Sequence, residues 1–433
     1  MSTSTKIILF IMIVLAIAGG VYWYLFFYGP GNGEVVVPTS NNGTSGGFIP
    51  LNAPSGQNNQ PTASTPEPSN NTETNATTTA DSANQTPVPV LRLISSTPIG
   101  GYSASTTASS TVVRWIDRGR GNILEAKSDS NEITTLSNTI LPRMYDSIWD
   151  KNLTAIIGSI LPSNTDTPTT VYAKLNKQLA TTTATSSENV TPFYLRGKNL
   201  PDNMLGYAVA PKGDKIFMLI KENNQSAGYI ANFDGTSVTK IFTNPITQVK
   251  VEWPEDSTIA ITTKASAGSS GYLYFINPKT GIWNKILGPI TGLSTKVSHD
   301  GKRILASATG RDGGIITNIY NVGTTTPEDT TLRTLAEKCT WGKFYKELVY
   351  CATPSTPTSA VYPDDWYKGT ITSYDKIWQL NAKNSDIRLV SSLINQADRT
   401  INAFNLNTDP KDDYLFFMNK DDLSFWSLDL NAH

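Results

Sequence analysis

The chain has few of the residues that most catalytic and metal sites need. It contains only two histidines, His299 and His433, and two cysteines, Cys339 and Cys351. These numbers exclude a histidine-rich zinc site and a four-thiolate metal site. A Ser-His-Asp triad would have to use His299, which lies in a turn motif and which we interpret as a turn residue. The sequence therefore predicts no metal, no cofactor and no catalytic residue, and we expect a protein that is not an enzyme.

Charge is also scarce and evenly balanced. Lys and Arg total 35, Asp and Glu total 36, and charged residues make up only 16% of the chain. Neither a basic surface for nucleic acid nor an acidic tail stands out, so we expect no nucleic-acid partner. Ser, Thr, Asn and Gly supply much of the polarity instead, a mixture common on extracytoplasmic surfaces.

One uncharged run stands out at the N-terminus, where residues 1–6 precede an apolar segment at residues 7–28. Its 22 residues are long enough to span a hydrocarbon core of about 30 Å as a helix. Lys6 precedes the run and the next basic residue is Arg92, which predicts a cytoplasmic N-terminus and an exported remainder. Cleavage of a signal peptide after Ala18 is the alternative interpretation. The preferred interpretation is a single-pass signal-anchor in the cell membrane.

Residues 29–88 predict a disordered stalk between this anchor and the rest of the chain. They are rich in Ser, Thr, Asn, Pro and Gly, and they contain no Lys or Arg. Their apolar content is too small to offset the entropy lost on ordering. A flexible chain of this length has a root-mean-square span of roughly 40 Å.

The remaining residues, 89–433, show short alternating strands separated by turns, which indicates an all-β domain. A polar turn followed by an apolar strand recurs, and the strands begin near Val113, Ala155, Ile216, Ile259, Ile304, Leu348 and Tyr414. Four of the six spacings are 42 to 45 residues, and the others are 61 and 66. About 44 residues is the length of a four-stranded propeller blade, so the repeat predicts a seven-bladed β-propeller with two insertions.

The two ends of this domain complement each other. The last repeat has room for three strands, at residues 401–406, 414–419 and 423–430, while residues 91–96 predict a strand without a repeat of its own. We therefore expect the N-terminal strand to complete the last blade. Such a closure removes the sheet edges that an open array would expose.

One repeat, SHDGKRILAS from Ser298, resembles the S-P-D-G-K-x-I-A-F repeat of TolB-type, WD40-like propellers. The matching positions are Ser298, Asp300, Gly301, Lys302 and Ile304, while His299 replaces the usual proline. APKGDKIFML, at residues 210–219, is a looser copy. Proteins of that family bind protein partners or serve in envelope complexes, so the resemblance implies a propeller and is compatible with a binding role.

The insertion that precedes Tyr414 holds the candidate binding site. Aromatic and charged side chains alternate there, and the candidate residues are Tyr362, Asp364, Asp365, Trp366, Tyr367 and Lys368. Exposed aromatic rings beside carboxylates suit sugar stacking or a protein contact. Alternatively, the loop folds its own rings onto the blade. Neighbouring carboxylates rarely face a glycosidic bond from two sides, so we do not expect a glycosidase pair.

The two cysteines flank the segment CTWGKFYKELVYC. A hairpin turn centred on Tyr345 would place Cys339 and Cys351 opposite each other on adjacent strands. In an exported domain we expect them to form a disulfide. The alternative is a pair of free buried thiols.

These observations predict a membrane-anchored propeller that acts as a protein- or glycan-binding scaffold of the cell envelope. A structural surface component is the main alternative, and an extracellular hydrolase or lyase using carboxylates of the central channel is less favoured. The expected partners are the membrane, through the N-terminal helix, and an envelope protein or glycan.

Overall fold

The computed structural model describes residues 87–163, 165, 167–178, 192–324, 326–355 and 360–432. The predicted anchor at residues 7–28 and nearly all of the predicted stalk lie outside these residues, and those two predictions stay open. Within the part that is described, no helix is both long and apolar enough to cross a membrane.

Strands dominate the described residues. Two α-helices of five residues, α2 (Asp364–Lys368) and α3 (Leu393–Ala397), and one 3-10 turn, η1 (Ala336–Lys338), interrupt them. Strands in the middle of each sheet read as continuous apolar runs because neighbouring sheets cover both of their faces. An example is the strand Ala155–Ile160, in which the first five residues are all buried.

The strands form six sheets, of which five have four strands. The first sheet joins both ends of the domain and contains β1 (Leu91–Ser95), β26 (Ala403–Thr408), β27 (Tyr414–Asn419) and β28 (Phe425–Asp429). Three others contain β10 (Met204–Val209), β11 (Lys215–Glu222), β12 (Gln225–Asn232) and β13 (Thr239–Asn244); β14 (Val249–Glu255), β15 (Thr258–Thr263), β16 (Ser270–Ile276) and β17 (Trp283–Thr291); and β18 (Ser294–Val297), β19 (Arg303–Thr309), β20 (Ile315–Asn321) and β21 (Glu328–Asp329). The fifth contains β22 (Cys339–Trp341), β23 (Leu348–Pro354), β24 (Asp375–Asn381) and β25 (Ile387–Ser392).

The sixth sheet has eight strands and consists of two antiparallel groups. The groups are β2 (Ile99–Thr106), β3 (Thr111–Asp117), β4 (Ile123–Lys127) and β5 (Ile133–Ser137), followed by β6 (Met144–Trp149), β7 (Ala155–Ile160), β8 (Thr169–Lys177) and β9 (Phe193–Asn199). They are joined by one parallel pairing, between Ser137 of β5 and Phe193 of β9.

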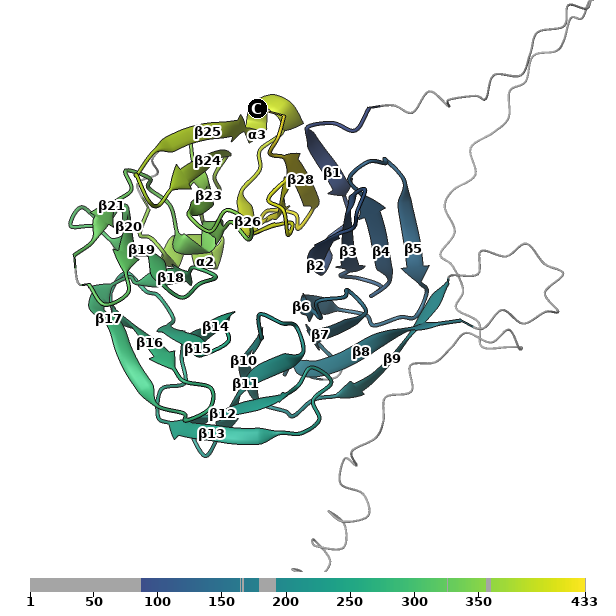
Figure 1. The fold of residues 1–433 in the computed structure, drawn as a ribbon, viewed down its shortest axis with the longest axis horizontal. Coiled ribbons are helices and arrows are strands. Elements are labelled where there is room, and N and C mark those ends of the chain that lie inside the picture. Colours follow the sequence, from purple (N-terminus) through teal and green to yellow (C-terminus); the bar gives the residue numbers. More distant parts are fainter. Residues whose placement is uncertain are drawn as a thin grey trace, which may run out of the picture. The chain divides into compact units, whose positions relative to one another are not determined.

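The sheets follow one another around a common centre (Figure 1). This arrangement is a β-propeller. In the sheet that closes the ring, β26 lies toward the centre and β1 at the outer edge. Apolar clusters fill the spaces between consecutive sheets; one of them combines Phe217 and Leu219 of β11 with Trp253, Ile259 and Ile261 of the next sheet. Face-to-face packing of this kind buries both sides of each sheet and holds the ring together.

The predicted repeat is confirmed at the level of the turns. Each predicted strand start lies in the second strand of its group, within two residues of the position where that strand begins. In four turns between first and second strands, a backbone N–H donates to the carbonyl five residues later, and these pairs are Asp150–Ala155, Ala210–Lys215, Ser298–Arg303 and Asp409–Tyr414. The fourth residue of each turn has a positive φ, and these residues are Leu153, Gly213, Gly301 and Asp412.

His299 occupies one of these turns and is exposed, as expected for a turn residue. Hydrogen bonds to the side chains of Ser298 and Asp300 fix the conformation of the turn. The Ser298 hydroxyl accepts a hydrogen bond from the Arg303 N–H at 2.9 Å, and the Asp300 carboxylate accepts one from the Lys302 N–H at 3.1 Å. Gly301 has φ 68°, a conformation that glycine adopts without strain.

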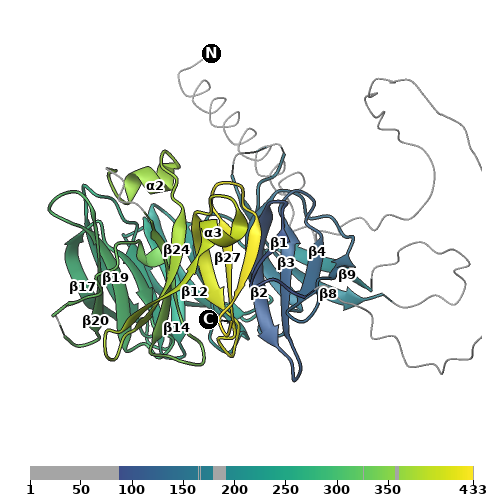
Figure 2. The same cartoon turned by 90° about the horizontal axis from the view of Figure 1, so that it is seen from above.

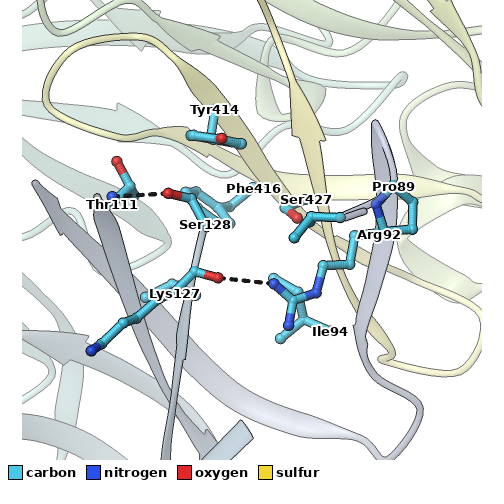
Figure 3. Close-up of a pocket in the computed structure, with 11 residues that line it drawn as sticks. Pro89, Arg92, Ile94, Thr111, Lys127, Ser128, Tyr414, Phe416 and Ser427 are labelled. Carbon is cyan, nitrogen blue, oxygen red and sulfur yellow. Dashed lines mark hydrogen bonds between the residues drawn. The ribbon is translucent and has the colours of Figure 1, made fainter. Parts of the chain in front are cut away.

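The expected closure of the ring is confirmed. β1 pairs with β28 in antiparallel register, with Leu91 opposite Leu428 and Leu93 opposite Trp426. Next to this pairing, the Arg92 guanidinium donates to the Lys127 carbonyl at 3.0 Å and so links the closing strand to the neighbouring sheet (Figure 3).

The disulfide prediction is also confirmed. Cys339 of β22 lies directly opposite Cys351 of β23, with 4.1 Å between their Cα atoms, and the two sulfur atoms are bonded. Both side chains are buried in the apolar cluster between β18–β21 and β22–β25.

Candidate functional site

The predicted site lies in the connection between β23 and β24. Its described residues from 360 to 374 are called the cap segment below. Figure 2 shows α2 of this segment standing above one face of the ring. The helix ends where Gly369 adopts φ 71° and donates its N–H back to the Trp366 carbonyl. This left-handed residue reverses the chain toward β24.

The three rings of the segment differ in their exposure to solvent. Tyr362 and Trp366 are only 6% and 5% exposed and pack against Leu335, whereas Tyr367 is 39% exposed. The first two rings therefore fold onto the propeller, as the alternative interpretation stated. Only Tyr367 keeps a ring available at the surface.

Beneath Trp366 lies a buried ion pair that sequence reasoning missed. The Lys338 amine is 2.8 Å from the Asp375 carboxylate and donates to the Ser373 hydroxyl and the Asn402 amide oxygen, each at 3.0 Å. Burial lowers the pKa of Lys338, and the negative charge of Asp375 opposes that shift. Nothing in the sequence around Lys338 distinguishes it from a surface lysine, because its partners come from distant strands.

The ion pair helps to position the cap segment. The Trp366 indole N–H donates to the same Asn402 oxygen at 3.2 Å, and the Trp366 ring centre lies 5.9 Å from the Lys338 amine and 5.0 Å from that of Lys420. A tryptophan ring next to two cations is held by cation–π attraction as well as by burial.

Tyr367 contacts a second charged group on the ring. Its hydroxyl donates to the Glu337 carboxylate, which also forms an ion pair with Lys250 at 2.8 Å. Burial alone would raise the pKa of Glu337, but Lys250 and the hydroxyl donors outweigh it, and the net effect lowers that pKa. Glu337 is therefore ionised at neutral pH and serves as the anchor of Tyr367.

The two predicted carboxylates bind backbone groups. Asp364 accepts a hydrogen bond from the Ala267 N–H at 2.6 Å, which lowers the pKa of Asp364, and Asp365 accepts one from the Val361 N–H at 2.8 Å. Both side chains therefore stabilise the segment. Lys368, the last predicted residue, is exposed.

The cap segment thus contacts three other sheets of the ring. Asp364 reaches the loop between β15 and β16, the Tyr362 carbonyl accepts from Thr309 of β19 at 3.1 Å, and Thr372 donates to Asp421 beyond β27 at 2.5 Å. Between these anchors it presents Val361, Tyr367 and Lys368 to solvent. The structure does not show what binds there, so the binding assignment stays a prediction.

In the part of the chain that the structure describes, neither a metal site nor the small cavity at the closing strand offers a second functional site. Among the described residues, no group of three His, Cys, Asp or Glu side chains is placed to hold a metal ion. A small cavity between β1 and the strands β3 and β4 (Figure 3) measures about 10 Å³. That volume is near the lower limit for one water molecule, so this cavity belongs to the seam of the ring.

The chain is similar to several solved propellers, at low identity. TolB from Acinetobacter baumannii is 11% identical with a TM-score of 0.40, and the match covers 66% of this chain and 77% of that one. The propeller domain of the Trilobed protease from Pyrococcus furiosus is 11% identical with a TM-score of 0.46 and coverages of 76% and 94%. An oligogalacturonate lyase from Vibrio parahaemolyticus is 11% identical with a TM-score of 0.43 and coverages of 77% and 97%. No protein-family model matches the chain, and no curated protein sequence matches it.

Proposed function

We propose that this protein is a membrane-anchored binding and scaffold module of the cell envelope, with its β-propeller outside the cytoplasm. The uncharged residues 7–28 supply the anchor and residues 29–88 the stalk. The disulfide between Cys339 and Cys351 supports export, because such bonds persist in oxidising compartments. The exported domain comprises residues 89–433.

The same proposal assigns seven blades to the ring. Two observations support it. The two halves of the eight-stranded sheet share a single residue pair, whereas strands within each half pair along most of their length. An apolar cluster also lies between those halves, and it combines Ile116 and Ile123 of the first half with Ile156 and Val171 of the second. Each half then counts as one blade.

The cap segment is the proposed contact surface, and its rigid attachment carries the proposal. Contacts with three other sheets hold it in one position, so Val361, Tyr367 and Lys368 are presented without a large ordering cost on binding. A tyrosine beside an aliphatic side chain and a lysine suits a protein partner. Because Tyr362 and Trp366 are buried, little aromatic surface is left there for sugar stacking.

A pull-down from intact envelopes with the full chain tests the proposal. The variant Val361→Asp/Lys368→Glu changes two exposed side chains and leaves the buried anchors in place. We expect it to lose the captured partner. The matched control is Phe344→Ser/Lys346→Glu, which alters exposed residues in a turn on the opposite face and should retain capture. Equal capture by both variants would contradict the proposed surface.

The location is tested separately on intact cells. A tag at the C-terminus should be accessible to antibody or protease added from outside, once any outer barrier is opened, without lysis of the cytoplasm. A cytoplasmic control protein must stay protected in the same cells. A tag that becomes accessible only after lysis would contradict export.

A further inference from the structure

A polar hollow of about 370 Å³ lies on the face opposite the cap segment. Two turns between first and second strands line it, one from the β6–β9 group and one from β10–β13. The start of the β12–β13 turn, with Phe233 and Asp234, and the side chains of Tyr172 and Lys174 on β8 complete the lining. The hollow is formed by turns between first and second strands, whereas the cap segment connects a second strand to a third. In an antiparallel sheet these two kinds of connection lie at opposite ends, so the hollow and the cap segment lie on opposite faces of the ring. The volume falls within the roughly 300–1,000 Å³ of small-molecule sites.

The walls are built by close contact. Gly213 has φ 73°, and a Cβ on it would come within 2.5 Å of the Lys151 Cβ, so only glycine lets the two turns meet. The Tyr172 ring packs edge-on against Phe233, with 6.3 Å between ring centres. Tyr172 is therefore held in place while remaining half-buried.

Some polar groups of the hollow are already occupied. Both carboxylate oxygens of Asp150 accept hydrogen bonds from Thr154, Lys212 forms an ion pair with Asp256 at 2.6 Å, and one oxygen of Asp234 accepts from Thr236. These bonds shape the turns and are not available to a ligand.

Other polar groups have no partner among the described residues. They are the Tyr172 hydroxyl, the Lys151 and Lys174 amines, and the second oxygen of Asp234. Burial, together with the nearby carboxylates of Asp234 and Asp150, raises the pKa of Tyr172, so its hydroxyl stays protonated and can both donate and accept. The hollow thus offers free donors and free acceptors around the Tyr172 ring.

The charge of the hollow narrows the class of ligand. Three lysines and three aspartates line it, so its formal charges cancel, and it has no reason to select a polyanion or a polycation. A neutral ligand with many hydroxyl groups and one apolar face matches free donors, free acceptors and an aromatic ring.

We infer that this hollow, called the Tyr172 hollow below, binds a neutral glycan. The Tyr172 ring contacts the apolar face of a sugar. Lys174 donates to sugar hydroxyls, and Asp234 accepts from them. The inference deepens the proposed function by naming a ligand class, and it rests on the proposed position of the domain outside the cytoplasm, where envelope glycans are present.

The test is titration of the purified full chain in detergent with three neutral probes, which are the trisaccharides of glucose, mannose and N-acetylglucosamine. A trisaccharide of uronic acids serves as the charged probe. We expect at least one neutral probe to bind more tightly than the charged one. If no neutral probe binds, or if the charged probe binds best, the inference is wrong.

Variants then locate the site. Tyr172→Ala should weaken the bound probe at least tenfold, and Tyr172→Phe, which keeps the ring, should weaken it less. Because Tyr172 packs on Phe233, Lys174→Met is tested as well; it changes an exposed side chain and should weaken binding about threefold or more. Normal affinity in Tyr172→Ala and Lys174→Met would place the sugar elsewhere and overturn the inference.

The outcome is separable from the protein-partner experiment. Val361→Asp/Lys368→Glu lies on the opposite face and should bind the sugar normally, while Lys174→Met should capture the envelope protein normally. If the natural protein captures the partner but binds no neutral probe, the glycan inference has failed; if it binds the probe but captures no partner, the proposed protein contact has failed.

Discussion

At the scale of single residues, the buried pair of Lys338 and Asp375 should contribute strongly to stability. Its charges are almost completely removed from water, with side chains only 2% and 0% exposed. Removing water from two charges is costly, and the direct contact and the added hydrogen bonds must offset that cost. The Asp375 carboxylate also accepts a hydrogen bond from the Ala403 N–H at 2.7 Å. Asp375 therefore links its own strand, β24, both to Lys338 and to the start of β26.

Lys338→Met should lower the free energy of unfolding by about 3–5 kcal/mol, because it leaves an unpaired carboxylate in the interior. The double variant Lys338→Met/Asp375→Asn should recover part of this loss, since the neutral amide oxygen still accepts from Ala403. Urea unfolding of the three proteins measures both values. A single variant within about 1 kcal/mol of the natural protein would show that water reaches the site.

Lys343 predicts a pH dependence. Its amine donates to the Thr408 carbonyl at 2.6 Å, and burial lowers its pKa to about 8 from the ordinary 10.5, against the attraction of Asp409 and Asp412. The unfolded chain binds more protons than the folded chain between these two pH values, so this residue makes stability rise as pH increases from about 8 to 10.5.

The difference in unfolding free energy between the natural protein and Lys343→Met isolates this effect. As the pH rises from about 8 to 10.5, we expect the unfolding free energy of the natural protein to increase relative to that of Lys343→Met by up to about 3 kcal/mol. Denaturant melts at several pH values measure it. A difference that stays constant with pH would mean that Lys343 has an ordinary pKa in the folded protein.

At the scale of elements, the sequence predicted where the cap segment lies and left open how its rings pack. Its place between β23 and β24 follows from the spacing of the repeat. The burial of Trp366 and the role of Asp364 depend on Asn402 and Ala267, which are 36 and 97 residues away along the chain. A local pattern of aromatic and acidic residues is the same whether the rings face water or a neighbouring sheet.

The β22–β23 hairpin supplies a prediction at this scale. The Cys339–Cys351 bond closes a short loop, with a separation of 12 residues, and should stabilise the domain by about 2–3 kcal/mol through the entropy of the unfolded chain. Unfolding and refolding in the presence and absence of a reductant compares the two forms without changing the sequence. Equal midpoints, with the free thiols verified by mass spectrometry, would contradict the expectation.

At the scale of the whole molecule, the closing strand decides whether the ring is complete. β1 contributes the buried side chains of Leu91 and Ile94 to the clusters on its two sides, and Arg92 links it to the neighbouring sheet. Without β1, the edge of β28 would be left unpaired and open to association with other chains.

A chain that begins at residue 97 should therefore be less stable than one that begins at residue 88. Loss of two buried aliphatic side chains costs about 3–6 kcal/mol, before any lost hydrogen bonds are counted. Thermal unfolding and light scattering should show a lower midpoint and earlier aggregation for the shorter chain. Identical melting and scattering would mean that the ring does not depend on its closing strand.

The sequence by itself determined the features that depend on local chemistry. Turn residues that tolerate positive φ, apolar strands at a repeat of about 44 residues and two cysteines flanking one hairpin predict the propeller, its closing strand and its disulfide. The tertiary structure alone decided which polar side chains are buried together and which surfaces stay open. Lys338 meets Asp375, which is 37 residues away, and Tyr172 comes to lie beside turns of the following sheet, only because the fold brings separate strands together. This proximity leaves no trace in any local run of residues.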